Sequence, residues 1–232
     1  MTNIQTMQVP FGIKNYWRMF KSKGIRLPIY YFFEAHLFDI LHGTDTHKWL
    51  PKAFINSKTV ITSEASIYMA SWTNEVKRSF RTLNDMLGVA FENYTFIDVG
   101  CGKGKVTIIW ESCCRSQGRR QEIYGLELLE DLIPIAQSNY MKIHGEPGKF
   151  LVKDASDINP IEFGKKFILY LYNPFNENIL ERMIRKFSNY ETVIVYNNPV
   201  HGDLLLSKGY EVIAGSNGFH GNLHTIIFRR CI

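Results

Sequence analysis

From residue 95 onward, short runs of apolar residues alternate with segments in which apolar residues recur at helical spacing. Runs rich in β-branched and aromatic residues, each followed by Gly, Asp, Asn or Pro, indicate strands. Five runs predict strands, at 95–99, 121–126, 150–152, 167–172 and 192–196. Apolar residues at helical spacing follow four of them, within 106–117, 130–144, 177–187 and 199–208. This alternation is typical of a doubly wound α/β fold with a parallel sheet.

The last 24 residues depart from the alternation. Segments 210–214 and 223–229 flank a turn rich in Gly and Asn, which predicts a β-hairpin. The run Phe-Ile-Leu-Tyr-Leu-Tyr at 167–172 is apolar throughout, as expected for a central strand covered on both faces. We therefore predict an α/β fold with a seven-stranded, mostly parallel sheet that ends in an antiparallel hairpin.

The first third of the chain has a helical pattern instead. Within 28–41 the apolar positions at helical spacing are Tyr30, Phe33, Leu37, Ile40 and Leu41. We expect an amphipathic helix ended by Gly43 that packs these side chains onto the main domain or over its cleft. A second helix, carrying Val76 and Phe80, should end near Gly88. Segment 63–68 is either a connector or a lid.

A length of 232 residues fits one large domain with an extension. We place a helical, basic N-terminal extension at 1–61, as a cap or lid, and the main domain at 62–232. Residues 1–33 contain no acid, and their cations include Lys14, Arg18, Lys21, Lys23 and Arg26. Such a run is either a solvated basic face, an organellar presequence, or a contact for an anionic membrane surface, a nucleic acid or an acidic substrate. The net charge of +5 is mild and by itself argues neither for nor against a polyanionic partner. We do not expect nucleic acid as the partner.

The cysteines do not predict a metal site. Cys101, Cys113, Cys114 and Cys231 have no metal-ligand spacing, and a reduced, cytoplasmic compartment is the expected location. No apolar run reaches the length of roughly 18 residues that a membrane span needs, and no signal-peptide pattern follows the N-terminus.

The candidate chemistry centres on residues 95–106. A predicted strand ends in Asp98, the glycines Gly100, Gly102 and Gly104 alternate, and a helical pattern begins. Alternating glycines permit positive φ and a close approach of the backbone to a ligand. The spacing G-x-G-x-G differs from the G-x-G-x-x-G of dinucleotide sites and from the phosphate-binding G-x-x-x-x-G-K-[ST]. We therefore expect Lys103 and Lys105 to be solvent-facing residues of the first helical turn and not ligands of a phosphate. The alternative to a ligand-binding loop is a plain turn between strand and helix.

This stretch resembles motif I of the class I S-adenosylmethionine (SAM)-dependent methyltransferases. The predicted order of elements is similar to their seven-stranded fold, in which the last strand inserts antiparallel. The resemblance implies SAM as cofactor, with its amino-acid part held by the glycine loop and Asp98 orienting that loop or holding the ammonium group through a water. It also implies ribose bonding by Glu127 and adenine bonding by Asp154. The implied cofactor-binding residues are Asp98, Gly100, Cys101, Gly102, Gly104, Glu127, Leu128, Asp154, Ala155 and Asn173.

The end of the fourth predicted strand is the usual methyl-transfer position in that family. Residues 172–175, Tyr-Asn-Pro-Phe, resemble the [DNS]-P-P-[YFW] motif of amino-group methylases, although this chain has one Pro where the motif has two. Asn173 is able to accept a hydrogen bond from a substrate donor. Tyr172 and His201 are the further catalytic candidates, His201 because an imidazole titrates near neutral pH.

The whole layout resembles a bacterial group of class I methyltransferases whose substrates are undefined. The group shares F-D-x-x-x-G-x-D-T, here at 38–46, and a strand ending in N-P-F. We predict methyl transfer from SAM to an N or O nucleophile of an unidentified acceptor, a small molecule or a protein side chain. The alternatives are a SAM-binding pseudoenzyme, or a scaffold that binds a partner through the basic N-terminus. An NAD-dependent oxidoreductase is disfavoured by the glycine spacing and the terminal hairpin.

Overall fold

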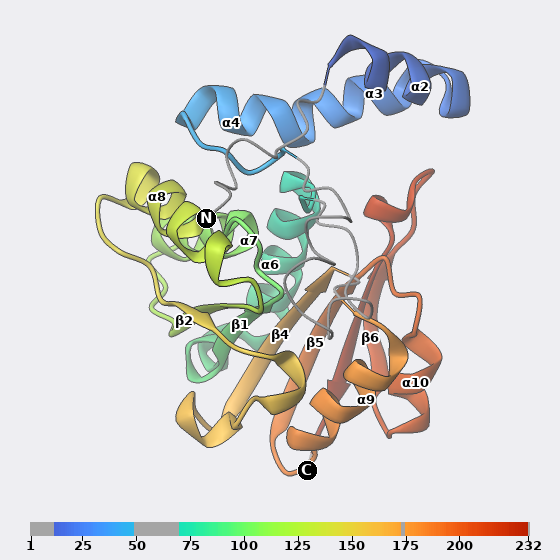
Figure 1. The fold of residues 1–232 in the computed structure, drawn as a ribbon. Coiled ribbons are helices and arrows are strands. Elements are labelled where there is room, and N and C mark those ends of the chain that lie inside the picture. Colours follow the sequence, from blue (N-terminus) through green and yellow to red (C-terminus); the bar gives the residue numbers. More distant parts are fainter. Residues whose placement is uncertain (1–11, 49–69, 173–174, 232) are drawn as a thin grey trace.

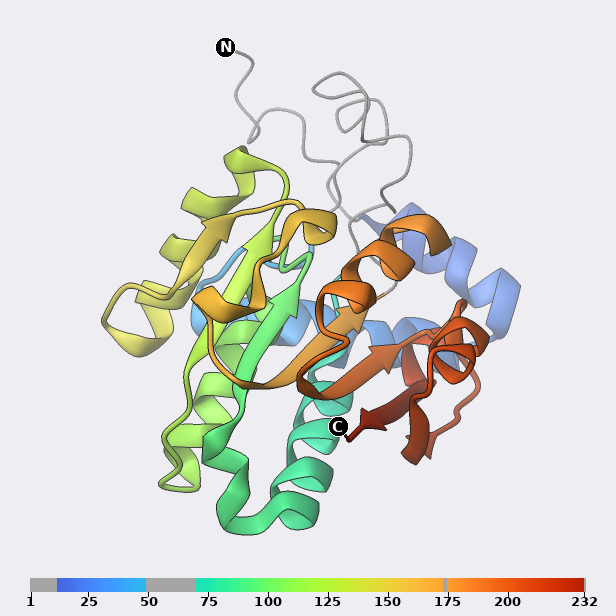
Figure 2. The same ribbon diagram turned by 90° about the horizontal axis from the view of Figure 1, so that it is seen from below.

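The computed structural model describes residues 12–48, 70–172 and 175–231. Its centre is a seven-stranded sheet of order β3-β2-β1-β4-β5-β7-β6 (Figures 1 and 2). The strands are β1 (Thr95–Val99), β2 (Ile123–Glu127), β3 (Phe150–Val152), β4 (Lys166–Tyr172), β5 (Glu191–Asn197), β6 (Glu211–Ser216) and β7 (Thr225–Arg230). Strands β1 to β5 pair in parallel, and β7 lies antiparallel between β5 and β6. The predicted fold class, including the terminal hairpin, is confirmed.

Helices cover both faces of this sheet, as Figure 2 shows from below. One face carries α6 (Thr73–Leu87), α7 (Lys105–Ser116) and α8 (Ile133–His144), and the other carries α9 (Glu177–Lys186) and α10 (Gly202–Ser207). Short 3-10 turns complete the connections: η3 (Gly88–Asn93), η4 (Glu130–Leu132), η5 (Ala155–Asp157), η6 (Pro160–Glu162) and η7 (Gly221–Leu223). The predicted ends of α6 at Gly88 and of α8 at Gly145 are confirmed.

Alternate residues of the central strands feed two separate hydrophobic cores. Phe96 of β1 and Tyr170 of β4 belong to the core under α6 and α7, while Ile97 and Leu169 belong to the core under α9. The Trp110 ring of α7 stacks on Phe96 with ring centroids 4.0 Å apart. Because side chains of a strand point alternately to opposite faces, an apolar run without polar interruptions requires a helix layer on each face.

The N-terminal residues form a chain of short helices that we call the arm (residues 12–48). It consists of α2 (Ile13–Lys23), α3 (Arg26–Tyr31), a π-helical turn η1 (Phe32–His36) and α4 (Leu37–His42). Gly43 ends α4 in the left-handed conformation, with φ of 64°, as predicted. The arm crosses the edge of the molecule at which the parallel strands end (Figure 1).

The face of the arm that packs on the domain is not the one predicted. Phe33, Ile40 and Leu41 are exposed, the last two by 66% and 68% of their surface. Of the predicted side chains, Tyr30 does pack on the domain, through the ring of Trp72, although part of its surface is exposed. The buried side chains of α3, η1 and α4 are instead Leu27, Pro28, Tyr31, Glu34, Ala35, Phe38 and Asp39. The π-turn is the physical reason for part of this error, since its wider i→i+5 turn shifts the helix face that an ideal period of 3.6 assigns.

Two predicted features of the N-terminal third lie outside the described residues. These are the domain boundary at 61/62 and the segment 63–68. The predicted helix that carries Val76 and Phe80 is observed as α6, which begins at Thr73. Among the described helices, none has both the length and the apolar content needed to cross a bilayer.

Candidate functional site

The three alternating glycines form a tight turn between β1 and α7. Gly100, Gly102 and Gly104 have φ of 77°, 54° and 82°, in the left-handed region that glycine favours. The backbone N–H groups of Gly100 and Cys101 both donate to the carbonyl of Leu126 in β2, at 2.8 and 2.9 Å. The turn lies at the topological switch point of the sheet, between β1 and β4, where the strand order reverses. Open α/β sheets bind ligands at this position.

Neighbouring side chains leave no room for larger residues in part of this turn. A Cβ atom at Gly104 would lie 2.9 Å from a ring carbon of Phe150 and 3.2 Å from Cβ of Ala136. Gly100, in contrast, is exposed. The turn therefore presents backbone, rather than side chains, toward the carboxyl ends of the strands.

Two buried carboxylates, Asp98 and Glu127, lie beside the turn. Asp98 Oδ2 accepts a hydrogen bond from Thr107 Oγ1 at 3.0 Å, and burial raises the pKa of Asp98 to about 7. Glu127 accepts from the N–H of Gly102 at 2.8 Å and from the N–H of Leu129 at 2.9 Å, and burial raises its pKa as well. Within the described part of the chain, neither carboxylate forms an ion pair. The site therefore holds two buried carboxyl groups with spare acceptor capacity beside the glycine turn.

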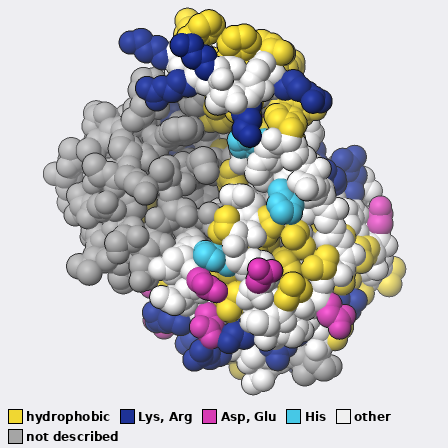
Figure 3. All heavy atoms as spheres, turned by 90° about the vertical axis from the view of Figure 1, so that its right-hand side faces the viewer, with side chains coloured by type: hydrophobic (Ala, Val, Ile, Leu, Met, Phe, Trp, Pro, Cys, Tyr) yellow, Lys and Arg dark blue, Asp and Glu magenta, His cyan; other side chains and the backbone are white. Residues whose placement is uncertain are grey.

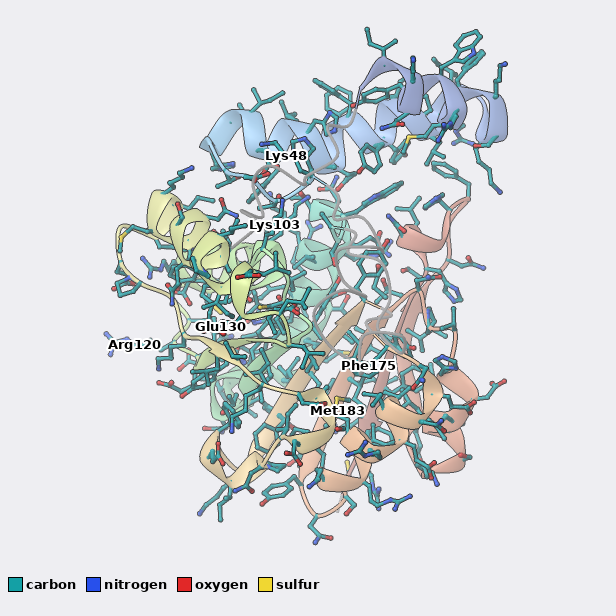
Figure 4. The ribbon with its side chains drawn as sticks, viewed as in Figure 1. Lys48, Lys103, Arg120, Glu130, Phe175 and Met183 are labelled. Carbon is teal, nitrogen blue, oxygen red and sulfur yellow. The ribbon has the colours of Figure 1, made fainter. Side chains whose placement is uncertain are left out.

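Lys103 and Lys105 are buried, so the prediction that they face solvent is wrong. The Nζ atom of Lys103 lies 3.3 Å from Asp45 Oδ1 and donates to the carbonyl of Lys48 at 3.1 Å, beneath the arm (Figure 4). Lys105 Nζ donates to the carbonyl of Glu34. Burial lowers the pKa of both ammonium groups, that of Lys105 to about 8. Both lysines therefore bond the arm to the glycine turn. They are buried because the arm covers positions that would otherwise face solvent.

The segment at 38–46 has a structural role that explains its motif. Asp39 is buried and accepts hydrogen bonds from Thr44, from the side chain and backbone of Thr46, and from His47. Burial alone would raise the pKa of Asp39, but these donors outweigh it and hold the pKa well below its ordinary value. Asp39 thereby folds the chain back after α4 and places Asp45 opposite Lys103.

Two polar residues that join the arm to the domain were missed by the sequence reasoning. Asn139 of α8 donates to the carbonyls of Asp45 and Lys103 and accepts from the N–H of Asp45. The carboxylate of Glu34 accepts from the backbone N–H and the side-chain amide of Asn74, and so caps the start of α6. For Asn139, the available signal was a polar residue on the apolar face of the predicted helix 130–144, which is the buried face of α8 with Ala136 and Tyr140.

Asp154 follows β3 at the same edge of the sheet as Glu127, as predicted. Its Oδ1 accepts from the N–H of Ser156 at 2.8 Å and caps the turn η5. Leu128 and Ala155, which follow Glu127 and Asp154 in the sequence, are half-buried. The structure thus brings the ends of β1, β2 and β3 together through adjacent strand pairing, while Asp154 also serves as a cap.

The catalytic candidates lie in different surroundings. Asn173 lies outside the described residues. Tyr172, at the end of β4, donates its hydroxyl hydrogen bond to Asn222 of the turn η7, and burial raises the pKa of its phenol. His201 is half-buried at the start of α10, a helix on the face of the sheet opposite α7. Each of these roles stays a prediction.

An aromatic stack that the sequence reasoning missed forms the second anchor of the arm. The rings of Tyr30 and His220 both stack on the buried Trp72, with centroids 6.1 and 5.3 Å from its ring. Tyr30 also meets Phe219 edge-on at 5.2 Å. Arm, α6 and the hairpin connection therefore meet in one aromatic contact above the end of β4.

No protein-family model matches this chain, and no curated protein matches its sequence. Among solved structures, the chain is similar in fold to magnesium protoporphyrin IX methyltransferase from Synechocystis PCC 6803 with bound SAM: the identity is 17%, the TM-score 0.47, and the match covers 68% of this chain and 77% of that one. With the same enzyme bound to S-adenosylhomocysteine (SAH), the identity is 14%, the TM-score 0.47, and the coverage 87% and 96%. A SAM-dependent methyltransferase from Aquifex aeolicus is similar at 13% identity and a TM-score of 0.44, over 68% of this chain and 97% of that one.

Proposed function

We propose that this chain binds SAM at the glycine turn and catalyses transfer of its methyl group to an N or O nucleophile of an acceptor, a small molecule or a protein side chain. The observation that carries the proposal is the pair of buried carboxylates, Asp98 and Glu127, at a turn of three positive-φ glycines. Removing two carboxylates from water is unfavourable unless cations or donors satisfy them. A ligand with a cationic end and two ribose hydroxyls supplies both.

The residues of the site fit the parts of SAM. The exposed backbone at Gly100 allows a close approach of the amino-acid part, and the carboxylate of Asp98 would attract its ammonium group. Glu127 already accepts two backbone N–H bonds, and its oxygens retain lone pairs for the ribose hydroxyls. Asp154 would accept from the adenine amino group. When bound, SAM supplies an electrophilic methyl group, and the protein contributes by holding the acceptor in line with it.

Asp98 and the glycine spacing favour SAM over a dinucleotide. NAD carries a pyrophosphate, which in dinucleotide-binding folds lies at a G-x-G-x-x-G turn and the following helix start. In this chain the turn has the spacing G-x-G-x-G and lies beside Asp98, whose ionised form would repel a pyrophosphate. Glu127 does not discriminate between the two, because an acid at the end of the second strand bonds the ribose in NAD sites as well.

Isothermal titration calorimetry with SAM, SAH and NAD tests the cofactor. We expect saturable binding of SAM and SAH and none of NAD. Binding of NAD without SAM would overturn the proposal. A transfer screen with methyl-labelled SAM across metabolites and proteins would then identify the acceptor, and SAM binding without transfer would favour the binding-only alternative.

Substitution of Glu127, the acid that we propose bonds the ribose hydroxyls, provides the sharpest test of the site. Glu127→Ala should weaken SAM binding by about 1.5–3 kcal/mol for each charge-assisted hydrogen bond lost. Glu122→Ala is the matched control, because Glu122 is exposed just before the same strand. Calorimetry measures both variants, with thermal unfolding to confirm that each is folded; equal affinities would show that Glu127 does not hold the cofactor.

The end of β4 is tested by turnover once an acceptor is known. Tyr172→Phe should lower kcat while SAM affinity is retained, because we place Tyr172 on the acceptor side. Asn173→Ala should lower kcat and also weaken SAM binding, because the resemblance places Asn173 at both the acceptor and the cofactor. Unchanged turnover in both variants would contradict the assignment of the catalytic position to β4.

A further inference from the structure

The outward surface of the arm is apolar to a degree unusual for a water-exposed helix surface. Nine large hydrophobic side chains of the arm are exposed and take no part in the stack on Trp72: Ile13, Trp17, Phe20, Ile25, Ile29, Phe32, Phe33, Ile40 and Leu41. Ile13, Trp17 and Phe20 follow at i, i+4 and i+7 on α2, so they share one helix face. Helix α2 has no buried residue, so this face is not used to pack the domain. Figure 3 shows the hydrophobic side chains along the outer rim of the arm.

Cations flank this apolar rim, and no carboxylate of the described arm accompanies them. Lys14, Arg18, Lys21, Lys23 and Arg26 are all exposed, and Lys and Arg spheres border the rim in Figure 3. The acids of residues 12–48 turn inward: Glu34 and Asp39 are buried, and Asp45 pairs with Lys103 and Lys48. Among the described residues, none of the five cations forms an ion pair with a carboxylate. The rim is therefore both apolar and uniformly positive.

We propose that the arm docks on the surface of an anionic lipid bilayer. Interfacial helices place apolar residues at the boundary between headgroups and acyl chains, while Lys and Arg contact lipid phosphates. Trp17 suits this boundary because its indole combines an apolar body with a polar N–H group. The inference does not depend on the proposed function, since lipid binding is measurable without SAM.

Other occupants fit the rim less well. A second copy of the chain, packed rim to rim, would bring its own five cations against these five. A nucleic acid would satisfy the cations through its phosphates but leave exposed side chains such as Ile13, Phe33 and Leu41 without an apolar partner. An anionic bilayer matches both the charge and the apolar area.

The arm also links such a surface to the candidate site. Through Lys103 and Lys105 it is bonded to the glycine turn, and it lies across the carboxyl ends of the strands. Docking would thus place the candidate site beside the lipid surface, where an acceptor held in the membrane would be within reach.

Co-sedimentation of the full chain with vesicles tests the proposal. The vesicles are phosphatidylcholine alone or phosphatidylcholine with about 30 mol % phosphatidylglycerol, the anionic component that should attract the cations. We expect binding to the anionic vesicles, loss of binding in high salt, and weak binding to the neutral ones. The emission of Trp17 should move to shorter wavelength on binding, a change that Trp17→Phe removes. Absence of binding to anionic vesicles would overturn the proposal.

Matched pairs of variants assign the binding to the rim. Arg18→Gln with Lys21→Gln should reduce the partition coefficient by about fivefold for each cation removed, whereas Arg182→Gln with Lys186→Gln on α9 should change it little. Ile13→Ser with Phe33→Ser should reduce binding, whereas Val89→Ser with Ile161→Ser, equally exposed elsewhere, should not. Equal losses in the arm and control pairs would overturn the assignment to the arm.

Two further measurements separate the other occupants. If the arm variants lose affinity for a single-stranded oligonucleotide while wild type does not bind anionic vesicles, the rim is a nucleic-acid contact and the proposal is wrong. If sedimentation equilibrium shows a wild-type dimer that the Ile13→Ser, Phe33→Ser variant converts to monomer, again without vesicle binding, the rim is a dimer interface.

Discussion

At the scale of single residues, four buried ionisable groups surround the glycine turn and serve two purposes. Asp98 and Glu127 remain beside the strand ends, where a ligand would bind, while Lys103 and Lys105 are directed into the arm. A buried charge is tolerated only with partners, and the lysines have theirs within the protein. Asp98 and Glu127 have neutral donors only, so a cationic ligand would stabilise the ionised form of these carboxyl groups.

Asp98 should make the stability of the free protein depend on pH. Its pKa is raised from 3.8 to about 7, so the folded chain keeps a proton that the unfolded chain has lost between those values. The free energy of unfolding should therefore fall as pH rises from about 4 to 7 and level off above. In Asp98→Asn this loss is absent, and the variant should be more stable at pH 8 by on the order of 2–4 kcal/mol. Urea unfolding at several pH values measures it.

The same substitution should have the opposite effect on SAM affinity, since Asn cannot attract an ammonium group. Wild-type binding should tighten as pH rises through about 7, where Asp98 ionises, and Asp98→Asn should bind more weakly throughout. A flat pH dependence of wild-type binding, measured by calorimetry, would contradict the role of Asp98.

Asp45 should be worth more to stability than an ordinary surface acid. Asp45→Asn leaves the fully buried ammonium group of Lys103 without its ionic partner, which should lower the free energy of unfolding by about 1–3 kcal/mol. Asp85→Asn, at an exposed position of α6, should stay within about 0.5 kcal/mol of wild type. Chemical unfolding compares the two, and equal values would show that the ion pair contributes nothing net.

At the scale of elements, the arm acts as part of the domain. Its π-turn η1 directs Glu34 inward, where the carboxylate caps α6 and the carbonyl accepts from Lys105. The cap is needed because Trp72, at the N-cap position of α6, makes no side-chain cap bond. The π-turn η1 therefore connects the arm to α6 and to α7 through Glu34.

Removal of this cap should loosen both elements. Glu34→Ala leaves the N–H of Asn74 without its partner and should lower the free energy of unfolding by about 1–3 kcal/mol. Glu211→Ala, an exposed change on the edge strand β6, serves as control. Thermal unfolding measures both, and an effect no larger than that of the control would show that the cap is dispensable.

At the scale of the whole molecule, arm, glycine turn and sheet form one connected body. The turn is bonded to β2 through Glu127 and to the arm through Lys103 and Lys105, and the aromatic stack on Trp72 joins the arm to the hairpin. Ordering of the turn by a ligand should therefore reduce local opening in the arm as well.

Hydrogen exchange with and without SAH measures this coupling. We expect SAH to slow exchange in the glycine turn and also within residues 34–48. In Lys105→Met the protection of the turn should remain while that of the arm declines, because one of the bonds between them is lost. Unchanged exchange of the arm in wild type would show that turn and arm are uncoupled.

The sequence by itself determined the sheet and the position of the candidate site. The short apolar runs, the helical spacings and the Gly residues that end α4 and α6 are local signals, because they arise from backbone geometry within a few residues. The same is true of the glycine turn and of Asp98, Glu127 and Asp154 at successive strand ends.

Only the tertiary structure decided which polar groups are buried and which apolar ones are not. Lys103 is separated from Asp45 by 58 residues, and Asn139 from Asp45 by 94, so no local pattern reveals these contacts. The helical spacing of residues 28–41 did not identify which face meets the domain, since the π-turn changes the register and Glu34 and Asp39 find their donors only when the arm is in place. Burial is a property of two surfaces in contact, and the chain specifies it only once both are folded.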